Sequence, residues 1–252
     1  MLTNVAAYRF APIADPPALA ARVRDWAGGE GLRGTVLVAE EGINLFLAGA
    51  DAAVAAFMCR LRAEPGLDRL QAKYSYSRAQ PFARLKVKRK QEIISFRRAG
   101  GAPLARRAPT VDPADLARWI ANGADDGGRR LVLLDTRNRE EVGYGTFDGA
   151  LALPIDNFTE LPGALGPHRD ALADATVVSF CTGGIRCEKA ALWMRDAGMD
   201  NVLQLEGGIL GYFEQVGGFG YRGECFVFDG RVALDPALRP RVDAAPALEE
   251  AA

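Results

Sequence analysis

The most restrictive feature of this sequence is a glycine-containing turn between a short strand and a helix, with a cysteine at its start. Residues 176–180 form an apolar, β-branched run typical of a buried strand, and residues 188–197 have helical character up to Gly198. The turn between them consists of Cys181, Thr182, Gly183, Gly184, Ile185, Arg186 and Cys187. A strand that passes through such a turn into a helix is typical of an α/β architecture.

The turn has the properties that stabilise a thiolate. Backbone N–H groups and the positive end of a helix favour an anion at Cys181, Arg186 adds a positive charge at the mouth of the loop, and glycines permit a tight backbone. We therefore predict Cys181 and Arg186 as catalytic, with Thr182, Gly183, Gly184, Ile185 and Cys187 completing an active-site loop. The alternative for Cys181 is a buried structural thiol. Cys187 is expected to pack inward, either as a structural thiol or as a redox partner that bridges to Cys181 under oxidation.

The length of this loop and its surroundings resemble the active loop of rhodanese (sulfurtransferase) domains. Four residues separate Cys181 from Arg186, whereas cysteine phosphatases use a loop one residue longer. Further matches follow the same order as in rhodanese domains: a strand ending in Asp135-Thr136-Arg137, then Glu140, Glu141, Gly149, Ala150 and Pro154, and finally Glu206-Gly207-Gly208. Asp135 and Arg137 are interpreted as structural support for the loops at the strand end, not as acid–base catalysts.

The complete string from Cys181 to Ala190 resembles one subfamily, the rhodanese-like tRNA uridine hydroxylases. The N-terminal half and the joints of the chain resemble the same subfamily at residues 39–44, 82–88, 108–110 and 226–229. The resemblance spans roughly residues 3–235. Many members continue into a cysteine-rich C-terminal tail, which has no counterpart in this sequence.

This resemblance implies an oxidoreductase that hydroxylates the wobble uridine of tRNA to 5-hydroxyuridine, with molecular oxygen as cosubstrate and a dependence on Cys181. The loop chemistry alone also permits a thiosulfate-type sulfurtransferase that forms a persulfide on Cys181. A noncatalytic RNA-binding adaptor is disfavoured because the loop retains its cysteine and arginine. Residues 29–34 match Gly-x-Gly-x-x-Gly, but they lie between a helix and a strand, the reverse of the order that binds a dinucleotide, so we interpret them as a turn. No flavin, haem or iron site is recognisable, and the four cysteines and single histidine do not form a metal site.

Positive charge is concentrated in one segment of a chain whose formal net charge is −1. Residues 60–107 contain fourteen basic and three acidic side chains, a net charge of +11, which suggests a polyanionic partner, here tRNA. Strand alternation puts Arg84, Lys86, Lys88 and Lys90 on one face and turns Leu85 and Val87 toward the core. Tyr74 and Tyr76 alternate on a strand that we expect to lie next to this one. We predict that these six residues contact RNA. The alternative is a solvated, aggregation-resistant sheet edge.

The order of elements predicts two domains of mixed α/β class. Residues 1–98 read as β-α-β-β-α-β-β, with strand-like segments at 70–75 and 85–96, which indicates a ferredoxin-like α+β sandwich with an antiparallel sheet. A linker at 99–112 leads to a rhodanese-like domain with a parallel sheet at 113–222. A closing hairpin is expected at 223–235 and a disordered tail at 236–252.

The composition of the sequence indicates in which cellular compartment the protein is expected. No segment approaches the roughly 18 apolar residues of a membrane span, and the N-terminus lacks the pattern of a signal peptide. The cysteine spacing does not suggest a disulfide framework. We therefore expect a cytoplasmic protein with no membrane association, and no protein partner is predicted.

Overall fold

The computed structural model describes residues 1–98, 103–104 and 106–243, which form two compact units. The first unit contains Met1–Ile94 together with Phe228–Val232 and residues 239–243, and the second contains Ser95–Val227 and Ala233–Leu238. Parts of the predicted linker (99–102 and 105) and the end of the predicted tail (244–252) lie outside the described residues. The mixed α/β class is confirmed in both units.

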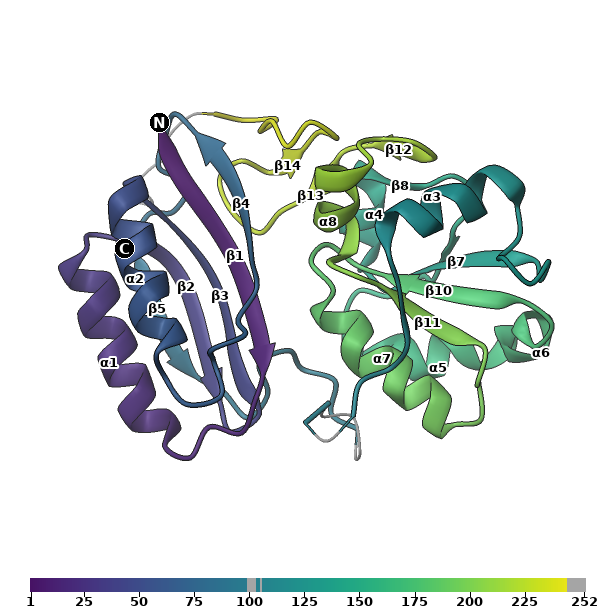
Figure 1. Ribbon diagram of the computed structural model, residues 1–252, viewed down its shortest axis with the longest axis horizontal. Coiled ribbons are helices and arrows are strands. Elements are labelled where there is room, and N and C mark those ends of the chain that lie inside the picture. The colour runs from purple at the N-terminus through teal and green to yellow at the C-terminus, as the bar shows by residue number, and fades with distance from the viewer. Residues whose placement is uncertain (99–102, 105, 244–252) are drawn as a thin grey trace. The chain divides into compact units, whose positions relative to one another are not determined.

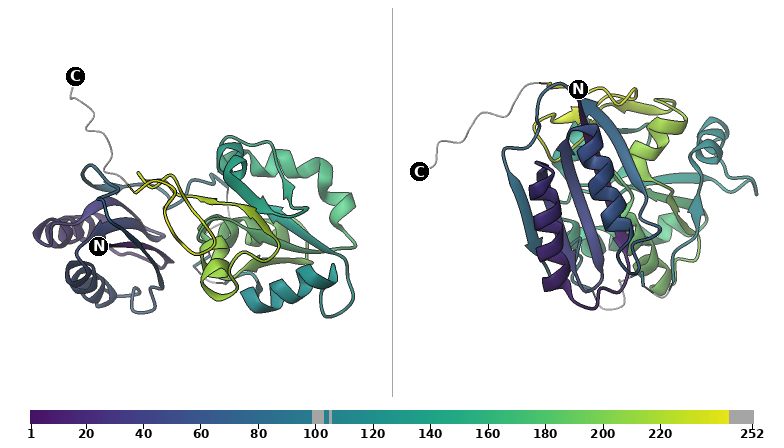
Figure 2. Two further views of the ribbon diagram at one scale, coloured as in Figure 1. Left: turned by 90° about the horizontal axis from the view of Figure 1, so that it is seen from above. Right: turned by 60° about the vertical axis from the view of Figure 1, so that its left-hand side comes forward.

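The first unit is a five-stranded sheet with two helices against one of its faces (Figure 1, Figure 2). The strands follow the order β4-β1-β3-β2-β5. Its elements are β1 (Leu2–Phe10), α1 (Pro16–Gly29), β2 (Arg33–Ala39), β3 (Gly42–Gly49), α2 (Asp51–Arg62), β4 (Ala72–Ser77) and β5 (Leu85–Arg89). The predicted helix-on-sheet sandwich is confirmed. The expectation of a wholly antiparallel sheet is wrong, because β5 joins the edge next to β2 and runs parallel to it.

Period-two alternation positions the core of the first unit under the helices. Val36, Leu45 and Leu47 are fully buried in that core. Their immediate neighbours along each strand point to the face without helices. α2 contributes Val54, Phe57, Met58 and Leu61 to the same core. α1 begins where the Asp15 side chain accepts a hydrogen bond of 2.8 Å from the backbone N–H of Ala18.

The basic strand β5 is shorter than its sequence pattern predicts. The expected strand ran from residue 85 to 96, but β5 ends at Arg89. The reason lies in two buried side chains that bind the following backbone. The Ile93 N–H donates to Glu41 Oε1 at 2.7 Å, and Asn44 Nδ2 donates to the Ile93 carbonyl at 3.1 Å. These bonds use the groups that a strand partner would need.

The second unit is built around a five-stranded parallel sheet, as predicted. The strand order is β6-β11-β10-β7-β9, and every pairing is parallel. The central strand β10 (Thr176–Phe180) is buried along its whole length, so its carboxyl end is a fixed platform. The other elements are β6 (Thr110–Val111), α3 (Pro113–Asn122), β7 (Leu131–Asp135), α4 (Arg139–Tyr144), β8 (Gly145–Phe147), β9 (Leu151–Ala152), α5 (Leu161–Leu165), α6 (Arg169–Leu172), α7 (Ile185–Asp196), β11 (Val202–Leu205) and α8 (Gly208–Gln215), with 3-10 turns at Phe158–Glu160 and Gly166–His168.

The C-terminal segment differs from the single hairpin expected at 223–235. β12 (Tyr221–Gly223) pairs with β8, and only β13 (Cys225–Phe226) and β14 (Ala233–Leu234) pair with each other. Between these last strands, residues 228–232 belong to the first unit. There Arg231 forms a buried ion pair of 2.6 Å with Asp229 and donates to Ser75 Oγ at 2.6 Å.

Residues 236–243, expected to be disordered, make defined contacts. The Leu238 N–H donates to the Asp235 carbonyl at 2.8 Å. Asp243 Oδ1 accepts hydrogen bonds from the backbone N–H groups of Arg78 and Ala79 at 2.7 and 3.2 Å. Hydrogen bonds therefore hold both Leu238 and Asp243 in a segment that composition alone marks as unstructured. None of the helices in the described ranges has the length and apolar character that a membrane span requires.

Candidate active site

Cys181 lies directly after β10, where the chain turns into α7. Its Sγ accepts a hydrogen bond of 3.2 Å from the backbone N–H of Gly184, and the residue has no exposed surface. The N–H groups of Arg186 and Cys187 also act on this sulfur. Gly184 has φ of 101°, a left-handed conformation that favours glycine and directs the N-terminal N–H groups of α7 at the sulfur.

The two thiols of the loop have opposite acidities. Burial acts to raise the pKa of Cys181, but the hydrogen bond from the Cys187 thiol, the charge of Arg186 and the loop N–H groups lower it to about 5. Burial and the neighbouring Cys181 raise the pKa of Cys187. The Thr136 hydroxyl, 3.4 Å from the Cys187 Sγ, acts to lower this pKa but does not reverse the overall increase. At neutral pH the pair therefore consists of a Cys181 thiolate and a Cys187 thiol that donates to it.

A titration of thiolate absorbance tests this assignment. The ultraviolet difference signal between the wild type and Cys181→Ser should appear as the pH rises through about 5, four units below the ordinary cysteine pKa of 9.0. In Cys187→Ser the midpoint should shift, because the thiol donor has been replaced. A midpoint near 9 in the wild type would contradict the thiolate assignment.

Arg186 lies inside the protein, which corrects the prediction that it sits at the mouth of the loop. It is 6% exposed and forms a two-pronged ion pair with Glu141, with Nη1–Oε2 and Nη2–Oε1 distances of 2.5 and 2.6 Å. Glu141 also accepts from the Asn138 N–H at 3.1 Å and from Thr182 Oγ1 at 3.4 Å. The carboxylate of Glu141 therefore holds both the arginine and the hydroxyl of the loop.

Glu141 is not among the site residues that the sequence predicts. Its position in the Glu140-Glu141 pair of the motif was the available signal, but its partner stands 45 positions away. Burial acts to raise its pKa, but the hydrogen bond and charge of Arg186 lower it overall, so Glu141 remains ionised.

Asp135 and Arg137 form a second buried ion pair, at the end of β7. Neither side chain is exposed, and Arg137 Nη2 lies 2.7 Å from Asp135 Oδ2. Asp135 also accepts from the Arg137 N–H at 3.0 Å and from Thr146 Oγ1 at 2.8 Å, while Arg137 Nη2 donates to the Gly145 carbonyl at 2.6 Å. The pair joins the loop after β7 to β8, so its contacts are those of a support.

Gly208, at the start of α8, determines the shape of the cysteine loop from outside it. A Cβ atom at Gly208 would lie 2.5 Å from the Cys181 carbonyl oxygen and 2.7 Å from the Gly184 nitrogen. The N–H groups of Ile209 and Leu210 donate to the carbonyls of Cys181 and Thr182 at 2.9 and 3.0 Å. The Glu-Gly-Gly motif marked this turn in the sequence, but not its contact with the loop.

Cys225 is a third buried thiol near the loop. Its pKa is raised to about 12, mainly by burial, although the Thr182 hydroxyl and the charge of Arg137 act in the opposite direction. It is therefore a protonated thiol at neutral pH. Within the described residues, no group of three or more His, Cys, Asp or Glu side chains is placed to hold a metal ion.

The six residues predicted to contact RNA do not form one surface. β4, with Tyr74 and Tyr76, lies at one edge of the sheet, and β5, with Lys86 and Lys88, lies at the other. Tyr74 pairs in register with Val5 of the helix-covered core, whereas Lys86 pairs with Thr35 on the other face. The prediction that the tyrosine strand neighbours the basic strand is wrong.

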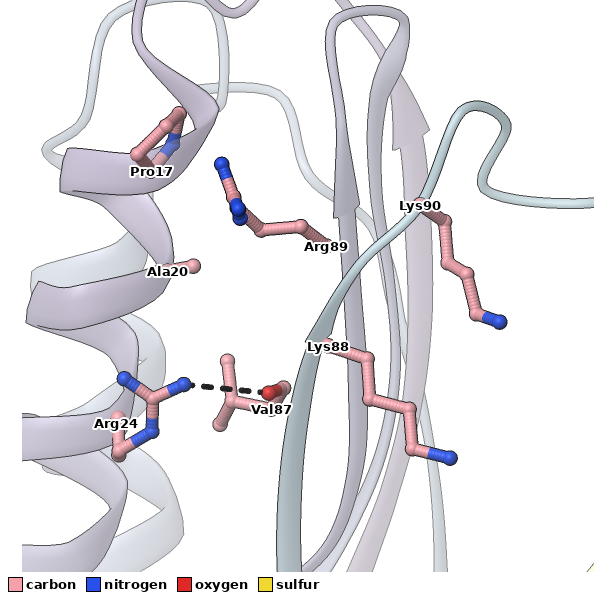
Figure 3. Close-up of a pocket in the computed structure, with 7 residues that line it drawn as sticks. All are labelled: Pro17, Ala20, Arg24, Val87, Lys88, Arg89 and Lys90. Atoms are coloured by element: carbon pink, nitrogen blue, oxygen red, sulfur yellow. Dashed lines mark hydrogen bonds between the residues drawn. The ribbon is translucent and has the colours of Figure 1, made fainter.

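A basic depression of about 470 Å³ lies between α1 and β5 (Figure 3). Arg24 and Arg89 point into it, and Arg24 Nη2 donates to the Val87 carbonyl at 3.3 Å. Lys88 and Lys90 are directed to the opposite side of the strand (Figure 3). The edge strand β5 thus presents cations on both faces, with Arg84 exposed just before it.

Comparisons with known proteins give the following matches. Residues 2–93 match the model of the UPF0176 acylphosphatase like domain, and residues 112–215 match that of the rhodanese-like domain. The tRNA uridine(34) hydroxylase of Xanthomonas axonopodis pv. citri is 68% identical over 97% of this chain and 98% of that protein. The tRNA uridine(34) hydroxylase of Xylella fastidiosa is 61% identical over 96% and 95%. A solved rhodanese-like domain from Anabaena is 22% identical over 46% of this chain and 79% of that one, with a TM-score of 0.37.

Proposed function

Because this chain belongs to the tRNA uridine(34) hydroxylase family, we propose that it hydroxylates the wobble uridine of tRNA to 5-hydroxyuridine, in a reaction that depends on Cys181. Relatives of this name match it over nearly the full length of both chains, which supports an oxidoreductase acting on tRNA. The observation that supports the dependence on Cys181 is the lowered pKa of its sulfur, held by the N–H groups of the α7 turn.

The proposed role of Cys181 is nucleophilic addition to the uracil ring. Its thiolate forms a bond to C6, and the electron pair of the C5–C6 double bond moves toward C5 and the adjacent carbonyl. The electron-rich C5 then takes an oxygen atom from molecular oxygen, the second oxygen atom being reduced to water by an external thiol reductant. Loss of the C5 proton and departure of the thiolate restore the double bond.

Access to the sulfur is a requirement of this mechanism. Cys181 has no exposed surface in this structure. A base can therefore reach the thiolate only if the atoms covering it move when RNA binds. The same requirement limits attack by small oxidants on an otherwise reactive thiolate.

A sulfurtransferase activity is the second candidate, supported by the rhodanese-like match over residues 112–215. In that reaction the Cys181 thiolate takes the outer sulfur of thiosulfate, releases sulfite, and passes the sulfur from its persulfide to an acceptor such as cyanide. The loop N–H groups that hold the thiolate are also suited to hold a persulfide.

Nucleoside mass spectrometry of cellular tRNA separates the two candidates. Deleting the protein should remove most 5-hydroxyuridine and its derivatives, and restoring the wild-type chain should return them. Growth with heavy-isotope molecular oxygen should place the label in 5-hydroxyuridine. Unchanged tRNA in the deletion strain, together with fast thiosulfate:cyanide turnover by the pure protein, would favour the sulfurtransferase.

A further inference from the structure

The face of the first unit's sheet that carries no helix has an ordered pattern of side chains. Strand register places one row across all five strands, consisting of Lys73, Ala6, Phe46, Thr35 and Lys86. The adjacent row consists of Tyr8, Asn44, Leu37 and Lys88; within it Asn44 is buried and donates to the Ile93 carbonyl, so the chain after β5 covers that one position. The first row is at least partly exposed at every position, and we call the two rows together the open face. Their neighbours along each strand, such as Val5, Leu45 and Val36, belong to the core under the helices.

Phe46 is placed at the centre of the open face with small residues on both sides. Its cross-strand neighbours are Ala6 and Thr35, and it is half-buried. It is not part of the hydrophobic cluster under α1 and α2. An aromatic ring flanked by small side chains on a sheet leaves space for a flat group to stack on it.

Cations stand at the ends of these rows. Lys86 and Lys88 are exposed at the β5 edge, and Lys73 ends the first row at the β4 edge. Phe46 and Lys86 are two strands apart, which is about 10 Å between their backbones. A lysine can lean inward over that distance, so a nucleotide stacked on Phe46 would have a cation near its phosphate. Neither of the two rows, both within the described strands, contains an acidic residue.

This combination matches single-stranded RNA better than a duplex or a protein. Duplex bases are stacked on each other and cannot lie on Phe46, whereas loop bases can. A protein partner would need a larger apolar centre than Phe46, Leu37 and Tyr8 provide within a frame of lysines. Stacking combined with phosphate contacts is the usual way in which proteins bind single strands.

We infer that the open face binds the anticodon loop of the tRNA, with a loop base stacked on Phe46 and phosphates held by Lys86 and Lys88. The inference rests on the proposed function for the identity of the RNA. It replaces Tyr74 and Tyr76, which lie on the other face at the far edge, with Phe46 as the stacking residue.

Binding of a fluorescent anticodon stem–loop to the full chain tests the inference. Phe46→Ala should weaken binding roughly 5- to 100-fold, the range for loss of one stacked base. Phe46→Trp should preserve binding, and Tyr74→Ala, a matched aromatic control, should leave it unchanged. Lys86→Ala and Lys88→Ala should each reduce the slope of log affinity against log salt by about one. A blunt RNA duplex should show no Phe46 dependence.

The outcomes are distinguishable from failure of the proposed function. Phe46→Leu keeps an apolar side chain without a flat ring, so its melting temperature should stay near that of the wild type while stem–loop binding weakens. If Phe46→Leu and Phe46→Ala bind as tightly as the wild type while the wild type makes 5-hydroxyuridine, the open-face inference is overturned and the function stands. If the wild type makes no 5-hydroxyuridine but the Phe46 variants lose stem–loop binding, the function fails and the open face remains an RNA site.

Discussion

Cys181→Ser is expected to abolish 5-hydroxyuridine formation while the protein stays folded. Serine is nearly isosteric and its hydroxyl can accept the same 3.2 Å hydrogen bond from Gly184. It remains protonated at neutral pH, whereas the pKa of Cys181 is lowered to about 5. The rate should fall by roughly a thousandfold or more, as when an enzymatic nucleophile is removed. Product formation on purified tRNA and the melting temperature are the two measurements.

Cys225→Ser supplies the matched control for this experiment. Cys225 is a buried cysteine of the same unit, but its pKa is raised to about 12, so no thiolate is lost when it is replaced. The folded Cys225→Ser variant should form 5-hydroxyuridine at a rate within a few-fold of the wild-type rate. A folded Cys181→Ser protein that still makes 5-hydroxyuridine would remove Cys181 from the mechanism.

Glu141→Ala is expected to destabilise the protein and to disable the loop together. The substitution leaves the Arg186 guanidinium, 6% exposed, without its carboxylate. An uncompensated buried charge costs about 3–5 kcal/mol of unfolding free energy. Because Glu141 also holds Thr182, the loop should shift, and a displacement of this kind lowers the rate by about a hundredfold. Urea unfolding and product formation measure the two effects.

Three variants separate positioning of the loop from simple loss of stability. Glu140→Ala changes the exposed neighbour in the same helical turn, and it should change neither the unfolding free energy nor the rate of product formation. Glu141→Ala combined with Arg186→Leu removes both buried charges, so it should regain stability without regaining activity. If Glu141→Ala matched Glu140→Ala in both measurements, the ion pair would have no role in holding the loop.

The pH dependence of Glu141→Gln follows from the sign of the pKa shift. Arg186 lowers the pKa of Glu141 in the folded state, so the carboxylate stabilises the protein above its ordinary pKa of 4.5. That contribution is lost as the pH falls through the lowered value. The stability difference between the wild type and Glu141→Gln should therefore shrink in acid.

The cysteine loop was predictable because its determinants are contiguous in the sequence. The strand, the glycines and the start of α7 fall within about twenty residues, and local pattern rules apply to them. The buried state of Arg186 was not predictable in this way, since it depends on Glu141, 45 positions earlier on α4. From the local sequence alone, an arginine near the loop cysteine is expected to be exposed at the mouth of the loop, because its buried ion-pair partner is not visible there.

The order of strands in the first unit could not be predicted from local sequence patterns either. Alternation correctly assigned Leu85 and Val87 to the core side of β5. It could not place β5 at the opposite edge from β4, because the segment between them crosses the sheet without a distinctive residue pattern. The tyrosines and lysines were therefore assigned to one surface although they lie on different faces.

Residues 228–232 and 239–243 complete the first unit, although most of the second unit precedes them in the sequence. This order affects how the protein can fold during its synthesis. Arg231, which bonds to Ser75, leaves the ribosome after Ser95–Val227 of the second unit, and Asp243, which bonds to the backbone of Arg78, leaves it after the entire second unit. The first unit must therefore wait, with its β4 edge incomplete, until residue 243 has been translated. A fragment cut at residue 98 would lack these bonds permanently, so the boundary seen in the sequence is not a place where the protein can be divided without loss.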